Sequence, residues 1–221
     1  MSKQQAVKLV LENINMLDEA YDFIEEELTP TIFGVIGEVI QDFVEQELDS
    51  RKGLFNFYED GINFTIPLWE TEKNDQSLSW KNSLARYELT SEKIVIEKED
   101  EGDHFWLTTL FSHQKDRMAF VFYPCWGNEK VKQTKSKWKT FLQKQYEAFP
   151  QLQTLGFKFY PNGLCWYLPI KPLDIQQVIA CYEEDNLEDA MGPIQDALKT
   201  LLEGHQYFLK IMENAKDKEN F

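Results

Sequence analysis

Residues 157–170 carry the pattern that most constrains the fold of this chain. Aromatic residues alternate with others before the pair Asn162-Gly163, and apolar residues alternate after it. Asn and Gly tolerate the positive φ angles of tight turns, and alternation places side chains on the two faces of a strand. The pattern therefore predicts a β-hairpin, and we expect Gly163 to adopt a positive φ.

A similar pattern occurs earlier, in residues 55–68. In both segments two Phe and a Tyr precede an Asn-Gly or Asp-Gly pair, and each segment follows a helical pattern. One hypothesis is a duplicated helix-hairpin unit over residues 31–68 and 134–170. The alternative is that hairpins resemble one another, because turn chemistry and alternation leave few choices. Both stay open, since nothing outside the hairpins aligns as well.

The first fifty residues predict two long helices. Over residues 3–28 apolar side chains recur at intervals of three and four. They are Val7, Val10, Ile14, Leu17, Tyr21, Ile24 and Leu28. Thr29-Pro30 resembles the start of a second helix, because proline is favoured in a first helical turn. We expect an intramolecular helical hairpin with the apolar stripe buried, so that Ile14→Asp would unfold the protein. The alternative is a stripe that docks another chain.

Alternating patterns predict most of a sheet in the middle of the chain. Residues 84–89 and 93–98 resemble a second hairpin, and residues 105–111 and 118–123 a third. Apolar residues on both faces place the whole third hairpin, residues 105–111 and 118–123, near the centre of the sheet, covered twice.

The expected fold class is α+β. An antiparallel sheet of consecutive hairpins would be flanked by the N-terminal helical hairpin and by C-terminal helices. Further helical patterns begin near residues 134, 174 and 192. No linker divides the chain, so we expect residues 1–221 to form a single domain.

Acidic residues are concentrated at the two ends of the chain. The net charge is −15, and residues 1–50 hold 12 acids and 2 bases, whereas residues 51–173 hold 15 acids and 17 bases. Such a surface repels duplex DNA and anionic membranes and attracts basic partners. The outer side of the first helix supplies the candidate partner-binding residues Asp18, Asp22, Glu25 and Glu26.

The cysteines suggest a reducing compartment. Cys125, Cys165 and Cys181 are odd in number and form no close pair. The N-terminus reads as an amphipathic helix and not as an apolar signal, and no apolar run is long enough to span a bilayer. We expect a cytoplasmic protein, a monomer or weak oligomer, that binds neither membrane nor nucleic acid.

Catalytic and metal-binding motifs are absent from the sequence. It contains no phosphate-binding loop, no dinucleotide fingerprint, no GxSxG, no HExxH and no CxxC. We therefore expect no catalytic residue, no metal and no cofactor. An enzyme with an unmarked pocket is the alternative, and aromatic residues near the turns would line it. The candidates are Tyr58, Trp69, Tyr160, Trp166 and His205.

Single reactive side chains have plainer explanations. His205 interrupts an apolar helical stripe, where a lone histidine is usually packed and hydrogen-bonded. Cys165 beside Trp166 is expected to be a small buried side chain and not a nucleophile. Six lysines lie in residues 130–144, but Trp138 falls on the apolar side, which favours a solvated helix face.

The leading functional hypothesis is an acidic, non-enzymatic binding protein. An inhibitor or immunity-type protein that neutralises a basic partner would have this charge layout and lack catalytic motifs. The alternatives are the enzyme with an aromatic-lined pocket and a structural subunit that docks through its N-terminal helix.

Overall fold

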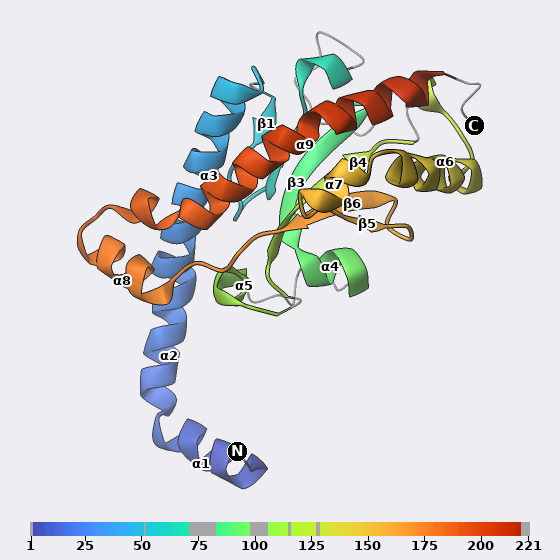
Figure 1. Cartoon of the computed structure of the whole chain (residues 1–221). Helices are drawn as coiled ribbons and strands as arrows, with labels where there is room; N and C mark the ends of the chain where they lie inside the picture. Colours follow the sequence, from blue (N-terminus) through green and yellow to red (C-terminus); the bar gives the residue numbers. More distant parts are fainter. Residues whose placement is uncertain are drawn as a thin grey trace.

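The chain folds as an α+β protein in the computed structural model, which describes residues 2–50, 52–70, 83–97, 106–114, 116–126 and 129–217. Helices at both ends flank an antiparallel sheet, as the sequence predicts (Figure 1). Within the described residues no helix is both long and apolar enough to cross a membrane.

The N-terminal helices form no hairpin, so that prediction is wrong. Helix α1 (Lys3–Glu12) ends at Asn13, and α2 (Ile14–Phe23) continues through the π-helix η1 (Ile24–Leu28) into α3 (Thr29–Glu47). Figure 1 shows α1 and α2 extending away from the rest of the protein. We call residues 3–23 the projecting arm.

A π-turn explains why Pro30 starts no separate helix. Proline lacks an N–H group, and in a regular α-helix its ring would clash with the carbonyl four residues earlier. The wider turn of η1 carries the backbone past this point, and the Thr29 N–H group donates to the Ile24 carbonyl. Pro30 then lies in the first turn of α3, where no N–H group is missed. The arm and α3 are therefore joined by continuous helix.

Six strands make one sheet in the order β1-β2-β3-β4-β6-β5, and every neighbouring pair is antiparallel. Their bounds are β1 Gly53–Leu54, β2 Ile62–Phe64, β3 Ala85–Ser91, β4 Met118–Pro124, β5 Lys158–Tyr160 and β6 Cys165–Pro169. The prediction for residues 118–123 is confirmed, because β4 lies between β3 and β6 and is buried on both faces.

The two similar segments lie at opposite edges of the sheet, but residues 55–60 form loop and turn and not the predicted strand, so β2 pairs with Gly53–Leu54 instead. The β5-β6 hairpin pairs Tyr160 with Cys165, which confirms the predicted turn, but the positive φ belongs to Leu164 at 57° and not to Gly163. Gly163 is required for space, because a Cβ there would lie 2.6 Å from the Tyr160 ring. In the first hairpin Gly61 does have a positive φ, of 71°. The duplication hypothesis stays a prediction.

Two predicted strands are helices. Helix α4 (Glu92–Glu97) replaces the predicted strand at residues 93–98, and α5 (Trp106–Phe111) replaces the one at residues 105–111; Lys98 and Phe105 lie outside the described residues. The Ser91 hydroxyl accepts a hydrogen bond from the Ile94 N–H group and so begins α4.

Helices cover both faces of the sheet. Helix α9 (Gly192–Lys216) crosses one face beside α3 (Figure 1), and Phe208 stacks on Phe122 of β4 with ring centroids 4.1 Å apart. On the opposite face Val95 of α4 packs with Val121 and Cys165. The buried Glu92 carboxylate anchors α4, because it accepts from Lys158 (2.8 Å) and pairs with Arg117 (3.0 Å).

The remaining elements are η2 (Pro67–Trp69), η4 (Glu129–Val131), α6 (Lys135–Ala148), α7 (Pro150–Thr154), α8 (Ile175–Glu183) and η5 (Leu187–Ala190). Of these, η2 lies between β2 and β3, η4, α6 and α7 lie between β4 and β5, and α8 and η5 connect β6 to α9. Side chains cap two of these helices: Thr134 accepts from the Lys137 N–H group, and Asp174 accepts from the Gln177 N–H group.

Candidate protein-docking site

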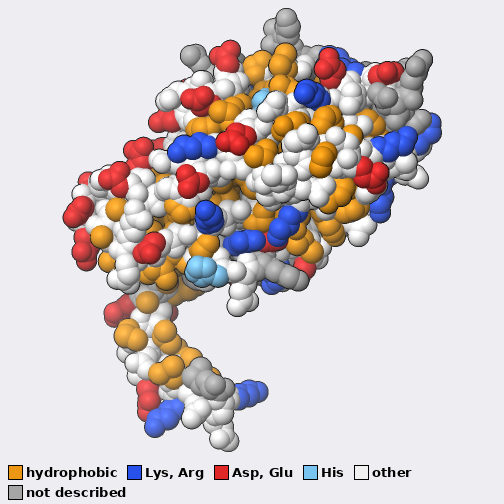
Figure 2. Space-filling model, in the orientation of Figure 1, with side chains coloured by type: hydrophobic (Ala, Val, Ile, Leu, Met, Phe, Trp, Pro, Cys, Tyr) orange, Lys and Arg blue, Asp and Glu red, His pale blue; other side chains and the backbone are white. Residues whose placement is uncertain are grey.

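The projecting arm exposes its apolar side chains. Within residues 3–23, all of which the structure describes, none is buried. Nine large apolar side chains are between 41% and 66% exposed: Val7, Leu9, Val10, Leu11, Ile14, Met16, Leu17, Tyr21 and Phe23. Figure 2 shows hydrophobic side chains along the arm, away from the rest of the protein. The expected burial of the stripe is therefore wrong for the single chain.

Helix α2 separates apolar from polar side chains cleanly. At about 100° per residue, its apolar residues fall on one half of the helix. They are Ile14, Met16, Leu17, Ala20, Tyr21 and Phe23. Asn15, Asp18, Glu19 and Asp22 fall on the other half. Since a fold usually buries such a face, the exposed half of α2 lacks a covering surface within the described residues.

Local capping specifies the start of the arm. The Ser2 hydroxyl accepts from the Gln5 N–H group, and the Gln5 side chain accepts from the Ser2 N–H group. Asn13 ends α1 and donates from its side chain to the Leu9 carbonyl (2.8 Å). Helices of this length are marginal in water by themselves, so a surface that covers the apolar half would also stabilise the arm.

The four candidate partner-binding acids divide into two environments. Asp18, Asp22 and Glu26 are exposed, whereas Glu25 is half-buried where the arm joins the body. The Tyr58 hydroxyl donates to Glu25 Oε2 over 2.9 Å. This hydrogen bond and burial raise the pKa of Tyr58. Glu25 is thus already engaged, and the exposed acids are the ones that a partner can contact.

Tyr58 lies in the turn before β2, which is itself packed against α3. Its neighbour Phe57 stacks on Phe33 at 4.2 Å between ring centroids and meets Trp106 edge-on at 4.8 Å. The turn is therefore packed against α3, and the hydrogen bond from Tyr58 to Glu25 links it to the base of the arm.

Helix α8 exposes a second apolar face. Ile175, Ile179 and Tyr182 are between 39% and 53% exposed, while Val178 on the same helix is buried. The spacing i, i+4, i+7 puts the three side chains on one face. The sequence shows this spacing, but periodicity alone cannot tell an exposed face from a buried one.

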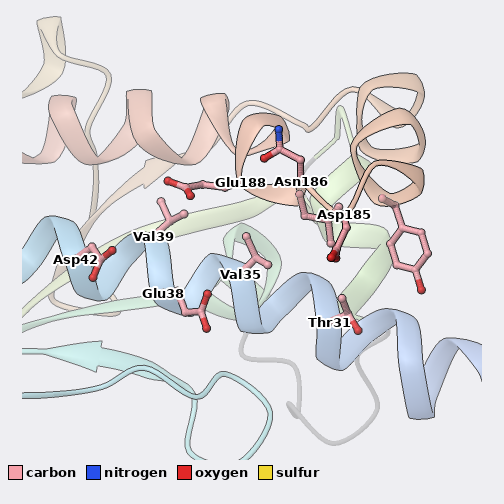
Figure 3. A pocket seen from close by; sticks show the side chains of 10 residues that line it. Thr31, Val35, Glu38, Val39, Asp42, Asp185, Asn186 and Glu188 are labelled. Atoms are coloured by element: carbon pink, nitrogen blue, oxygen red, sulfur yellow. The ribbon is translucent and has the colours of Figure 1, made fainter.

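An acidic cavity adjoins this face. It has a volume of about 500 Å³ and lies between α3 and the segment that links α8 to α9 (Figure 3). Its acidic lining consists of Glu38, Asp42, Asp185 and Glu188. As far as the described residues show, no Lys, Arg or His lines it, and none of the four carboxylates forms an ion pair. Tyr182 and Thr31 also line the cavity, so α8 lies beside the first turn of α3.

The five proposed pocket residues lie in different places. Trp69 and His205 are in contact, with ring centroids 5.3 Å apart, and Trp166 is buried nearby against Phe208. Tyr160 donates to the Ile96 carbonyl (2.9 Å) on the other face of the sheet. Tyr58 lines a cavity beside the turn that holds it. The structure thus brings Trp69 and His205 into contact, whereas Trp166 meets Trp69 only through the ring of Phe122.

His205 is packed and hydrogen-bonded, as predicted. Its Nδ1 shares a 2.8 Å hydrogen bond with the Tyr87 hydroxyl. Burial lowers the pKa of His205 to about 4 and raises the pKa of Tyr87 far above its usual value. The pair is therefore neutral at neutral pH. Its surroundings are the aromatic rings of Trp69 and Phe208, and not a carboxylate that would orient a catalytic base.

The described cysteines and lysines add no reactive centre. Burial raises the pKa of Cys125 and of Cys165 to about 12, so neither is a thiolate at neutral pH, and the prediction for Cys165 is confirmed. Trp138 is fully buried while the six lysines of residues 130–144 are exposed. No group of three or more potential metal ligands occurs among the described residues; His104 lies outside them.

Comparison with known proteins gives no relative: no family model matches the chain, and neither a curated protein nor a solved structure is significantly similar to it.

Proposed function

We propose that this protein is a protein-binding module that docks a basic partner through its projecting arm. The observation that carries the proposal is the exposed apolar half of α2, together with the absence of any buried side chain in residues 3–23. Exposed contiguous apolar surface on a folded protein typically marks an interaction site.

Burial of this surface would supply the binding energy. Fully burying one large apolar side chain is worth about 1.5–3 kcal/mol, before the costs of association are subtracted. Because the apolar residues of α2 span half of the helix, a groove covers them better than a single flat surface does. This is the helix-in-groove mode of recognition.

The acids on the other half of α2 support a partner with basic edges around its groove. Between residues 9 and 50 the sequence contains no Lys or Arg, so attraction to such edges is opposed by no nearby base. Complementary charge mainly speeds association and selects among partners. A second copy of this chain fits less well, because acids would face acids.

This chemistry suits an inhibitor or immunity-type protein that neutralises a basic protein. The three cysteines are free, which supports a reducing compartment, and the proposal places the complex in the cytoplasm. An anionic lipid surface is disfavoured as the occupant because the acidic half of α2 would be repelled by it.

A site-directed cross-link identifies the partner and its location together. A photoreactive residue at Met16, on the apolar half, should capture the partner in the native cell, whereas one at Glu19, on the acidic half, should capture it poorly. The captured protein is then purified, and its dissociation constant is measured with the wild type, with Ile14→Asp plus Leu17→Asp, and with Asn15→Asp.

The two variants add charge to opposite halves of one helix. The apolar-half variant should weaken binding by at least about 100-fold, and Asn15→Asp should change it by less than about threefold. Equal binding by both variants would refute the arm as the docking site. If cross-linking joins only copies of this chain, the arm mediates self-association and does not bind a basic partner.

A further inference from the structure

We propose that α8 and the neighbouring acidic cavity form a second docking surface, which binds a basic amphipathic helix. The apolar side of that helix would cover Ile175, Ile179 and Tyr182, and one of its Lys or Arg side chains would enter the cavity. The inference rests on the proposed function in one respect only, that the occupant is a segment of protein.

The apolar face of α8 is more than the fold itself uses. Val178 and the half-buried Cys181 attach α8 to the core, and Ile175, Ile179 and Tyr182 point elsewhere. Two β-branched aliphatic side chains and an aromatic ring at the spacing i, i+4, i+7 make a continuous apolar strip. An isolated exposed apolar residue needs no explanation, whereas three aligned ones indicate a contact surface.

Tyr182 joins the strip to the cavity. Its ring belongs to the exposed face of α8, and Tyr182 also lines the cavity, as Thr31 of α3 does. A helix that packs along the strip therefore passes the cavity mouth. The cavity is closed at its sides by α3, which carries Glu38 and Asp42, and by the turn after α8, which carries Asp185 and Glu188.

The charge around both features determines the kind of occupant. The carboxylates of the cavity have no ion-pair partner among the described residues, and Glu183 and Glu184 follow the strip directly. A cationic side chain would therefore be attracted into the cavity, which at about 500 Å³ has room for it and for bridging water. A second copy of this chain would bring its own acidic helices against these acids.

A designed peptide probes this surface without knowledge of the partner. The probe is a fluorescent 18-residue peptide of Leu and Lys only, ordered as an amphipathic helix, and its control is a scrambled peptide of the same composition. Both are titrated against the full chain that carries Ile14→Asp and Leu17→Asp, so that the apolar half of α2 is disrupted.

The amphipathic peptide should bind this protein at least about tenfold more tightly than the scrambled one, since only the ordered helix can match both the strip and the cavity. Ile179→Asp should weaken binding about tenfold, and Ala180→Asp, on another side of α8, should not. Glu38→Lys should weaken binding of the amphipathic peptide by a similar factor and reduce the salt dependence of that binding. Glu47→Lys, on the same helix but outside the cavity, should change neither the affinity nor its salt dependence.

Three results would overturn the inference. They are equal binding of the two peptides, no binding of the amphipathic peptide by the protein that carries Ile14→Asp and Leu17→Asp, and equal effects of Ile179→Asp and Ala180→Asp. The second result leaves the arm as the docking site, so the proposed function would survive. Conversely, failure of the cross-linking experiment at Met16 would leave the α8 surface untouched. Sedimentation that shows dimers lost on Ile179→Asp would identify a second copy as the occupant and refute the basic helix.

Discussion

The Tyr58 hydroxyl donates to Glu25 across 2.9 Å and so joins the turn before β2 to the π-helix at the base of the arm. The two residues are separated by 33 positions in the sequence. Glu25 lies on the last turns before Pro30, and Tyr58 is fixed by the stacking of Phe57 on Phe33. A partner that pulls on the arm acts on this hydrogen bond.

Substitution of Glu25 by Gln should lower the pKa of Tyr58 toward 10. The hydrogen bond to the charged carboxylate is the largest cause of the raised pKa, and a neutral amide can turn its N–H group toward the phenolate, so it no longer opposes loss of the proton. Titration of ring-labelled tyrosine by NMR measures the shift, with Tyr58→Phe to assign the signal. An unchanged pKa in Glu25→Gln would show that the contact does not persist in solution.

Ile14→Asp should leave the protein folded, the reverse of what the sequence predicts. Ile14 is 51% exposed, so the new charge stays in water and the free energy of unfolding should change by less than about 0.5 kcal/mol. Ile36→Asp on α3, where the side chain is fully buried, should unfold the protein. Thermal melts of the two variants decide the point, and unfolding by both would mean that the arm packs inside.

This reversal shows what periodicity can and cannot predict. The stripe from Val7 to Leu28 correctly indicates helix, but a repeat of apolar residues does not say what covers it. The covering surface depends on where the chain turns, and Thr29-Pro30 resembles a turn from sequence alone. The π-turn that lets the helix continue has no local sequence signature of comparable strength.

The sheet was predictable where alternation is strong and both neighbours are strands. Strands β4 and β6 meet that condition, and their predictions hold. Residues 92–97 are helical although a strand is predicted there. Glu92 forms ion pairs with Arg117 and Lys158, which are distant in sequence, and these pairs together with the Ser91 cap favour a helix. The acidic cavity was likewise hidden, since two of its carboxylates lie on α3 and the other two lie far along the chain, Asp185 after α8 and Glu188 in η5.

Gly163→Val should destabilise the protein by about 1–3 kcal/mol, for a steric reason rather than a conformational one. Any Cβ at this position would lie 2.6 Å from the Tyr160 ring and 3.1 Å from the Cys165 sulfur. Gly34→Ala is the matched control, because a Cβ there meets nothing within 4 Å and alanine is the better helix former. Chemical denaturation should show a lower free energy of unfolding for Gly163→Val, and one higher by up to about 1 kcal/mol for Gly34→Ala. Equal stabilities of Gly163→Val and the wild type would show that the hairpin turn does not lie at this position.

His205 should make stability depend on pH between 6.5 and 4. Burial lowers its pKa to about 4 from an ordinary 6.5, so the unfolded chain binds a proton in this range and the folded protein does not. The contribution of His205 to the free energy of unfolding is complete above pH 6.5. It is lost as the pH falls toward 4, by at most about 1.4 kcal/mol per pH unit.

A comparison with His205→Gln isolates this contribution, because the carboxylates titrate alike in both proteins. The stability advantage of the wild type over the variant should shrink between pH 7 and pH 5. Tyr87→Phe removes the hydrogen bond but keeps the half-buried imidazole, so it should retain the pH dependence of the wild type. Parallel stability curves for wild type and His205→Gln would show that the histidine is not shielded from water as described.

Reversal of two exposed charges on α2 tests whether the acidic half of the arm contributes to recognition. Asp18→Lys with Asp22→Lys should leave the melting temperature nearly unchanged, since exposed charges contribute only about 0–1 kcal/mol per pair.

Association with the basic partner captured at Met16 should slow by about tenfold at low salt, and high salt should slow the wild type toward the same rate. Dissociation should change less, because the apolar half holds the complex together. Stopped-flow measurement at two ionic strengths separates the two rates, and Gln4→Lys near the start of α1 controls for added positive charge elsewhere on the arm. If the double reversal associates as fast as the wild type at low salt, the acids serve solubility alone and the partner need not be basic.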